Sequence, residues 1–354
     1  MALPPRMWLS PLASGVDVFF RDTILNRARR PERVAHADRK KALLEAIDAT
    51  VEPWMFDDRE RFFPLRPVVS PERRRGRSIV PGEVLELRWK SEFEPIYEEN
   101  RALFAKLERN GRARARIIRR DPEHPRPTLL LVHGFMGGAP DLEERLFPVR
   151  ELFAAGYDLA IATLPGHGGR KDGGRFDRPR WPAHGPRFTI DGYRQAISDL
   201  RALVHHLRDE GAPAVGALGM SLGGYTSALL ATVEPRLDAV IPFVPLASMA
   251  QYMFENGQLP GTREEQLELR ELVDVLFSPA SPTARPVLVP HAGRKVVAGK
   301  VDRITPVSHA SRLARHFGVA VETFEGGHLL QWGKTAALLS AIERSRASFA
   351  ARRP

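Results

Sequence analysis

The sequence predicts an α/β fold with a mostly parallel central sheet and helices on both faces. Three observations lead to this expectation. Short apolar runs such as Thr128–Val132 alternate along the chain with longer segments of helical periodicity. These runs carry few polar residues, as expected of strands that are covered on both faces. Gly-rich or polar segments follow several of them directly, at the sheet edge where ligands gather in this architecture.

The individual elements follow in order from residue 83. Strands are expected at Val84–Trp89, Ala113–Arg119, Thr128–Val132, Asp158–Leu164, Ala212–Ala217, Leu237–Leu246, Lys295–Ala298 and Val319–Phe324. Helices are expected at Glu92–Leu107 (or a connector there), Leu142–Ala154, Ile190–Arg208, Tyr225–Val233, Arg263–Phe277, Val307–Phe317 and Lys334–Ala351. Pro242 and Pro245 should confine regular pairing to the early part of their strand, because proline donates no ladder hydrogen bond.

Residues 1–80 have a different pattern, and we treat them as an N-terminal extension of a main domain at 81–354. Helices are expected at Val16–Arg30 and around Lys40–Ile47. Aromatic residues then alternate with prolines, and they need a surface to bury against. We therefore expect this segment to wrap over the main domain through Trp54, Phe56, Phe62 and Phe63.

Composition excludes several classes of site. The 354 residues include no cysteine, which removes disulfides, thiolate metal sites and cysteine nucleophiles. The histidines lack metal-ligand spacing, and the Gly-rich loops match neither a phosphate loop nor a dinucleotide-binding motif. We expect no metal and no cofactor.

No apolar run is long enough to span a bilayer, and we interpret the N-terminus as mature sequence, which favours a cytoplasmic location.

The net charge of +10 is concentrated in the first third of the chain. No aromatic-interleaved basic motif accompanies it, so we do not expect nucleic-acid binding. A basic amphipathic stretch with Trp8, Phe19 and Phe20 could instead rest on a membrane surface, and peripheral membrane contact stays open as an alternative.

The segment Gly219-Met220-Ser221-Leu222-Gly223 lies between a predicted strand and a predicted helix. In that context, Gly-x-Ser-x-Gly is a nucleophile elbow. The turn holds the serine at strained backbone angles, and a Cβ on either glycine would collide with a neighbouring element. We expect Ser221 to be a nucleophile.

A nucleophilic serine needs a base, a carboxylate that orients the base, and donors for an oxyanion. His328 follows a strand after Gly326-Gly327 and is the predicted base, whereas His205, His206 and His309 are expected on the surface. Asp302 is the predicted carboxylate, with Glu325 and Asp274 as alternatives. A competing role for Asp302, capping the next helix, suits Thr305 better.

The oxyanion donors are expected from two turns. Leu222 N–H lies at a helix N-terminus, and the loop His133-Gly134-Phe135-Met136 supplies Phe135 N–H. We expect His133 and His167 to support their loops and not to transfer protons.

The chain resembles the α/β-hydrolase superfamily over about residues 113–354. The resemblance rests on Leu131-Val132-His133-Gly134-Phe135, Leu164-Pro165-Gly166-His167-Gly168, the elbow and Gly326-Gly327-His328, with Asp302 between the last two. It implies the triad Ser221, Asp302 and His328, an oxyanion hole from the Phe135 and Leu222 amides, and a lid at 249–290. The extension is not part of the common fold, and a long N-terminal wrap with a short lid is similar to a branch of abhydrolase-domain proteins.

We expect hydrolysis of a carboxylic ester, of a small molecule or a lipid, through an acyl-enzyme on Ser221. An apolar acyl pocket is expected from Met136, Met220, Met249, Tyr252, Met253 and Phe254. Acyltransferase, thioesterase or amidase chemistry on the same triad stays open, as does a non-catalytic protein that binds membrane surfaces.

Overall fold

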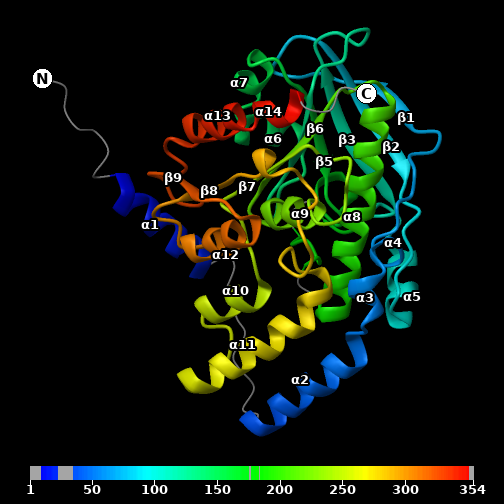
Figure 1. Ribbon diagram of the computed structural model, residues 1–354. Helices are drawn as coiled ribbons and strands as arrows, with labels where there is room; N and C mark the ends of the chain where they lie inside the picture. Colours follow the sequence, from blue (N-terminus) through cyan, green and yellow to red (C-terminus); the bar gives the residue numbers. More distant parts are fainter. Residues whose placement is uncertain (1–8, 23–34, 175–176, 183, 351–354) are drawn as a thin grey trace, which may run out of the picture.

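The computed structural model in Figure 1 describes residues 9–22, 35–174, 177–182 and 184–350. Its centre is a nine-stranded sheet in this described part of the chain. The strands are β1 (Glu72–Arg75), β2 (Glu83–Lys90), β3 (Arg112–Arg119), β4 (Thr128–Val132), β5 (Asp158–Thr163), β6 (Val215–Met220), β7 (Ala239–Phe243), β8 (Val296–Gly299) and β9 (Val321–Phe324).

The strand order is β1-β2-β3-β5-β4-β6-β7-β8-β9. β1, β2 and β3 form an antiparallel edge, and β3 pairs antiparallel with β5. Every further pair, from β5–β4 to β8–β9, is parallel. The predicted mostly parallel sheet is confirmed. The apolar runs of β4 and β5 are buried throughout, as their composition requires.

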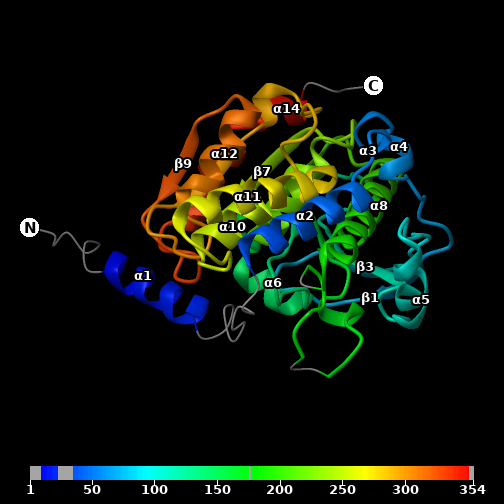
Figure 2. The same cartoon turned by 90° about the horizontal axis from the view of Figure 1, so that it is seen from below.

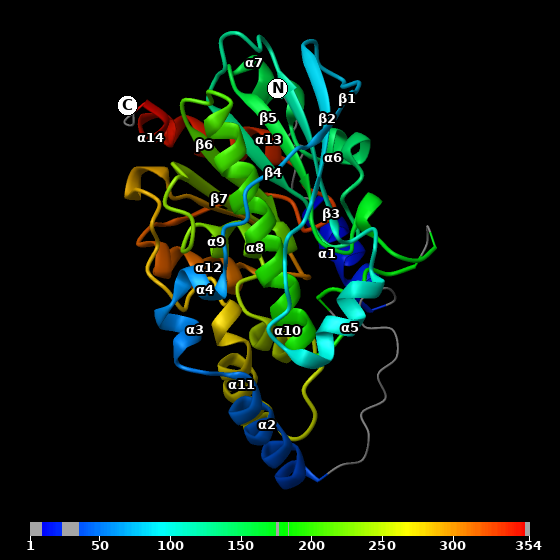
Figure 3. The same cartoon turned by 90° about the vertical axis from the view of Figure 1, so that its right-hand side faces the viewer.

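Helices cover both faces of the sheet (Figures 1 and 3). One buried cluster joins the sheet to α8, α9 and α12, and a second joins the opposite face to α7, α13 and α14. The helices are α1 (Leu9–Phe20), α2 (His36–Thr50), α3 (Trp54–Asp57), α4 (Arg59–Phe62), α5 (Glu98–Lys106), α6 (Pro140–Leu146), α7 (Val149–Ala154), α8 (Pro186–Asp209), α9 (Leu222–Leu230), α10 (Met249–Glu255), α11 (Arg263–Phe277), α12 (Val307–Phe317), α13 (Lys334–Arg344) and α14 (Arg346–Ala350).

Proline accounts for two differences from the predicted elements. The single helix expected at Leu142–Ala154 is wrong, because the segment forms α6 and α7 with Pro148 at the break. β7 runs through Pro242 but ends at Phe243, three residues before the predicted end of the strand at Leu246. Its ladder with β8 is nevertheless reduced to the single pair Phe243 and Val297, since Pro242 has no N–H to donate.

The N-terminal extension is attached to the main domain over much of its described length. Phe62 and Phe63 are buried in the cluster under α8. Side chains of α8 also bind backbone carbonyls of the extension: Arg194 Nε donates to Phe62 O at 2.8 Å and Ser198 Oγ to Pro64 O at 2.7 Å. β1 extends the sheet and begins before residue 81. The change in sequence pattern near residue 81 therefore does not coincide with a boundary in the packing of the structure.

The two predicted N-terminal helices are longer or displaced in the structure. The helix expected at Val16–Arg30 is α1, which begins earlier and ends at Phe20; residues 23–30 of that prediction lie outside the described residues. The segment expected around Lys40–Ile47 lies inside α2.

The region expected as a lid, residues 249–290, begins with the helices α10 and α11. Seen from below in Figure 2, α2 of the extension lies alongside α11. His36 and Lys40 of α2 both bind Glu268 of α11. Of the helices described, none is both long and apolar enough to cross a bilayer.

Candidate active site

The turn between β6 and α9 presents Ser221 in a strained conformation. Its φ of 56° and ψ of −113° lie outside the regions that L-residues ordinarily adopt. Close packing requires the flanking glycines. A Cβ on Gly219 would lie 2.0 Å from the carbonyl oxygen of Gly223, and one on Gly223 would lie 2.0 Å from that of Val132. Two hydrogen bonds fix the turn: Ser221 N–H donates to Phe243 O, and Tyr225 N–H to Ser221 O.

Three side chains from distant parts of the chain meet at this turn. His328 Nε2 lies 3.0 Å from Ser221 Oγ, and His328 Nδ1 lies 2.8 Å from Asp302 Oδ2. A carboxylate only accepts hydrogen bonds, so Nδ1 carries the proton. Nε2 is then the acceptor that faces the serine hydroxyl. The structure brings together the three residues predicted as a triad.

Asp302 is held by its own loop. Its side chain is almost fully buried, and Oδ1 accepts the N–H groups of Ile304 and Thr305, both at 2.8 Å. Oδ2 is left for His328 and for the Thr305 hydroxyl, which is 3.1 Å away. The capping role considered for Thr305 is wrong: α12 begins after Pro306 without a side-chain cap, and Thr305 also contacts Val244 O and His328 Nδ1.

The alternative carboxylates are engaged elsewhere. Glu325 forms an exposed ion pair with Lys300. Asp274 accepts one hydrogen bond from Ser248 and binds Arg312. Of the three candidate carboxylates, Asp302 is the one whose side chain contacts His328.

The environment raises the pKa of His328 above its ordinary 6.5. Burial alone lowers the pKa of this imidazole, but the charge and hydrogen bond of Asp302, together with the charge of Asp17, outweigh the burial. The protonated form that a base passes through is thus stabilised at this site.

The two predicted oxyanion donors belong to residues in or next to segments that adjoin Ser221. Leu222 is the first residue of α9, and Phe135 follows Gly134, whose Cβ position would be 3.4 Å from the Ser221 Cβ. Within the described residues, neither amide hydrogen of Phe135 and Leu222 is bonded to an acceptor. Both N–H groups are available to an oxygen bound beside Ser221.

Buried side chains support the Phe135 loop from behind. His133 Nε2 accepts the Leu164 N–H at 3.0 Å while its Nδ1 lies 2.8 Å from Gly134 O. Burial lowers the pKa of His133 to about 4, so this histidine is neutral and structural. Glu143 Oε1 accepts the Gly138 N–H at 2.7 Å, and burial raises the pKa of that carboxyl to about 7.

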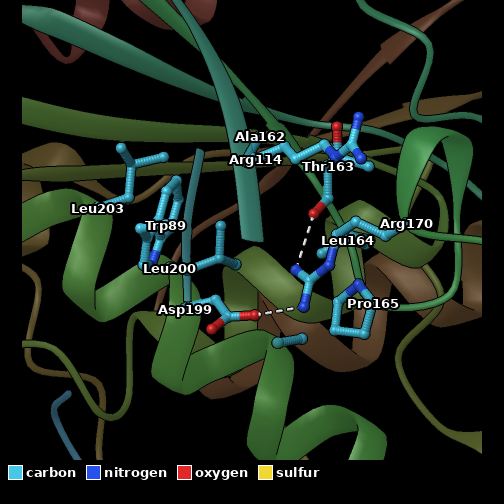
Figure 4. A pocket seen from close by; sticks show the side chains of 11 residues that line it. Trp89, Arg114, Ala162, Thr163, Leu164, Pro165, Arg170, Asp199, Leu200 and Leu203 are labelled. Carbon is cyan, nitrogen blue, oxygen red and sulfur yellow. Dashed lines mark hydrogen bonds and ion pairs between the residues drawn. The ribbon is translucent and has the colours of Figure 1, made fainter. Parts of the chain in front are cut away.

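His167 is likewise buried, and its Nδ1 lies 2.8 Å from Pro165 O. Burial lowers its pKa to about 3. Nearby, Figure 4 shows a pocket between β3, β5 and α8 in which Arg170 reaches Thr163 O at 3.1 Å and Asp199 at 2.7 Å. This buried ion pair fixes the loop after β5, and no triad residue lines the pocket.

The six residues predicted to bind substrate are divided between several places. Met136 is 46% exposed beside the Phe135 amide, and Met220, next to Ser221, is half-buried. Met249 and Tyr252 pack from α10 against the main core cluster. Met253 and Phe254 pack in a separate cluster between α10 and α11, where Phe254 is buried and the Arg263 guanidinium lies 3.8 Å from its ring centre.

One histidine lies elsewhere than predicted, and one buried carboxylate was not predicted to take part in the site. His309, expected on the surface, is fully buried: Nδ1 accepts the Ala247 N–H, and Nε2 lies 3.2 Å from Glu255. Asp17 in α1 is also fully buried and accepts the N–H groups of Arg303, His328 and Leu329. In the sequence, the only indication of this role is that Asp17 is a single charged residue between the apolar Val16 and Val18. In the described ranges, no group of three or more metal-ligating side chains is placed to hold a metal ion.

The chain is similar to one family model, to curated proteins and to solved structures. A family model described as serine aminopeptidase, S33, matches residues 123–286. Two curated relatives, uncharacterized proteins from two strains of Mycobacterium tuberculosis, are each 31% identical over 257 residues, which is 70% of this chain and 56% of theirs. The match thus spans little more than half of those relatives.

The solved structures are more distant in sequence. Acetyl xylan esterases from Thermoanaerobacterium sp. and Paenibacillus sp. R4 each align with a TM-score of 0.57 at 16% identity, over 85% of this chain and 98% of theirs. At this identity the likeness concerns the fold.

Proposed function

We propose that this chain, which has the fold of the α/β hydrolases, is a serine hydrolase that cleaves a carboxylic ester through an acyl-enzyme on Ser221. The observation that carries the proposal is the continuous hydrogen-bonded series from Ser221 Oγ through His328 to Asp302. A strained serine at a helix N-terminus, with two available amide donors beside it, adds the remaining features of this chemistry.

In the first half-reaction, Ser221 Oγ attacks the ester carbonyl carbon and its proton passes to His328 Nε2. The carbonyl oxygen becomes an oxyanion that accepts hydrogen bonds from the Phe135 and Leu222 N–H groups. His328 is then an imidazolium, which Asp302 stabilises. The carbon–oxygen bond to the leaving alcohol breaks, and that alcohol takes the proton from Nε2.

In the second half-reaction, water attacks the acyl carbon while His328 Nε2 accepts its proton. The same two amides receive the oxyanion. Ser221 Oγ leaves and recovers its proton from His328, and the carboxylic acid product departs. The triad ends in its starting protonation state.

The acyl group would contact apolar side chains on either side of the nucleophile. Met136 and Met220 are adjacent in sequence to the Phe135 amide and to Ser221, and Met249 and Tyr252 come from the proposed lid. These side chains favour acyl esters, lipid esters included, over sugars. Phe254 is a core residue of the proposed lid, and we do not assign it to the pocket.

Amide cleavage is the second candidate, because the matching family model is described as a serine aminopeptidase. The triad serves both reactions, so matched substrates distinguish them: nitrophenyl esters against nitroanilides with the same acyl group. We expect the ester series to be turned over with the higher kcat/KM. A higher kcat/KM on the anilides would select the amidase alternative, and transfer to an added alcohol would select an acyltransferase.

Labelling by a fluorophosphonate probe tests for an activated serine. Wild type should be labelled, whereas Ser221→Ala and His328→Ala should not be. The exposed Ser308 and His291 offer matched controls, and Ser308→Ala and His291→Ala should be labelled like wild type. Labelling that survives Ser221→Ala would sink the proposal.

Peripheral membrane contact is a separate proposal about the extension. On α1, Leu12 and Phe19 are 54% and 69% exposed. The full chain should co-sediment with anionic vesicles more than with neutral ones, and Leu12→Ser should weaken this binding. Equal binding to both vesicle types would remove the electrostatic part of the idea.

A further inference from the structure

Helix α1 brings a buried carboxylate against the loop that carries His328. Asp17 Oδ2 accepts the His328 N–H at 2.7 Å and the Arg303 N–H at 3.2 Å. Its second oxygen, Oδ1, accepts the Leu329 N–H at 3.0 Å. The Asp17 side chain thus links the backbone of the loop that carries His328 to the backbone of Arg303, the residue after Asp302.

One face of α1 makes these contacts. Ala13 and Asp17, four residues apart, are both fully buried against the loops. On the same side, Ser14 Oγ accepts a hydrogen bond from Arg303 Nε at 2.9 Å, and Ser10 Oγ lies 3.3 Å from Glu325 O. In Figure 1, α1 lies beside β9 and α12, whose adjoining loops supply these partners.

The glycines before His328 are shaped for this approach. A Cβ on Gly327 would lie 2.5 Å from Asp17 Oδ2, and one on Gly326 would lie 2.5 Å from the Trp332 amide nitrogen. Neither glycine has a positive φ. They are needed for close packing, and in the case of Gly327 the packed group is the Asp17 carboxylate.

We infer that Asp17 is a positioning residue of the active site, which holds the Asp302 and His328 loops in register so that Nε2 faces Ser221. This inference rests on the proposed function, because a positioning role has meaning only if the triad reacts. The hydrogen-bond partners are backbone amides, so the role needs a carboxylate at this place and no contact with substrate.

Asp17 also contributes charge. It faces His328 together with Asp302, and its negative charge favours the imidazolium. The other charged groups around it are Arg303, bound to Ser14, and Arg21, whose guanidinium reaches Arg303 O at 3.5 Å. The exposed pair of Lys300 and Glu325 lies on the same two loops. Replacing Asp17 by the neutral Asn therefore lowers the pKa of His328.

The test compares Asp17→Ala, Asp17→Asn and the control Ser14→Ala. Ser14→Ala removes an α1 contact to Arg303 but leaves the His328 loop untouched. For each variant, kcat and KM on a nitrophenyl ester are measured against pH. Hydrogen exchange of residues 326–330 is measured separately in a Ser221→Ala background, where it does not depend on turnover.

For Asp17→Ala we expect kcat to fall about 10- to 100-fold with KM little changed, as for a displaced catalytic group. Exchange of the 326–330 segment should accelerate at least about tenfold. Asp17→Asn retains one acceptor oxygen, so its loss should be smaller, and the acid limb of its pH profile should move to lower pH. Ser14→Ala should stay within about twofold on both measurements.

Wild-type kcat and wild-type exchange in both Asp17 variants would overturn the inference. So would an equal loss in Ser14→Ala, which would mean that docking of α1 as a whole is what matters. If Asp17→Ala does not fold, Asp17→Asn decides alone. If wild type itself is not labelled by fluorophosphonate, the proposed function fails, while the exchange data still report whether Asp17 holds the loop.

Discussion

Replacement of Asp302 by Asn separates the charge of this side chain from its structural role. Asn keeps the size of Asp, and its carbonyl oxygen can still accept the Ile304 and Thr305 amides that Oδ1 accepts now. Its NH2 group then takes the place of Oδ2, 2.8 Å from His328 Nδ1. Two donors cannot bond each other, so the imidazole must shift its proton to Nε2. Nε2 then donates to Ser221 and no longer accepts its proton.

The expected loss is roughly 10⁴-fold in kcat, the magnitude found when the same change forces the wrong tautomer in a serine protease triad. That corresponds to about 5.4 kcal/mol of transition-state stabilisation. The assay is hydrolysis of a short-chain nitrophenyl ester, with thermal unfolding as the check on folding. Glu325→Gln is the matched control, because Glu325 lies on the base loop but pairs with Lys300 in solvent, and its kcat should be unchanged. A loss of less than tenfold in Asp302→Asn, or a similar loss in the control, would refute the assignment of the acid.

Three further predictions follow from pKa shifts and close contacts. Because the pKa of His328 is raised, kcat/KM should fall as pH drops, with a midpoint above 6.5; a midpoint below that value would contradict the described charge environment. Burial raises the pKa of Glu143 from 4.5 to about 7. Between these two pH values the folded state keeps a proton that the unfolded state has released. The free energy of unfolding should therefore fall by up to about 3 kcal/mol as pH rises through that window. Urea unfolding should show this fall in wild type and not in Glu143→Gln, and parallel pH curves would count against it. Gly219→Ala would place a methyl group 2.0 Å from a backbone carbonyl oxygen and should abolish labelling of Ser221, whereas Gly15→Ala, with nothing within 4 Å, should leave it unchanged.

The parts of the fold and site that could be predicted are those with short-range signals. The apolar runs of β4 and β5 predict buried strands because few other structures bury four consecutive apolar residues between turns. The elbow is readable because both of its glycines are required by contacts within a few residues or one neighbouring strand. Asp302 and His328 follow strands whose ends meet at one edge of the sheet.

The parts that could not be predicted depend on contacts between distant residues. Asp17 lies 311 residues from the amide that it binds in His328, and no local pattern reports such a pair. His309 begins a helix, which suggests exposure, but α10 covers it and Glu255 pairs with it. Phe254 was predicted to line the pocket because it is an apolar residue of the segment expected as a lid. Sequence alone does not show which side of α10 faces α11, and Phe254 lies on that side. The split of α6 and α7 at Pro148, by contrast, had a local cause that the helical periodicity masked.

The extension contributes to the core, to the sheet and to the candidate site, and this argues against a minimal folded unit that begins at residue 81. Such a chain would lose Phe62 and Phe63, whose truncation to Ala typically costs about 3–5 kcal/mol each, and it would leave Arg194 without the carbonyl that it binds. It would also lose Asp17, so that the His328 amide would be left without its acceptor. The superfamily motifs begin only after residue 113, yet the packing that stabilises their arrangement comes partly from the segment before them. The extension is therefore a structural part of this fold, and any displacement of α1 would act directly on the position of His328.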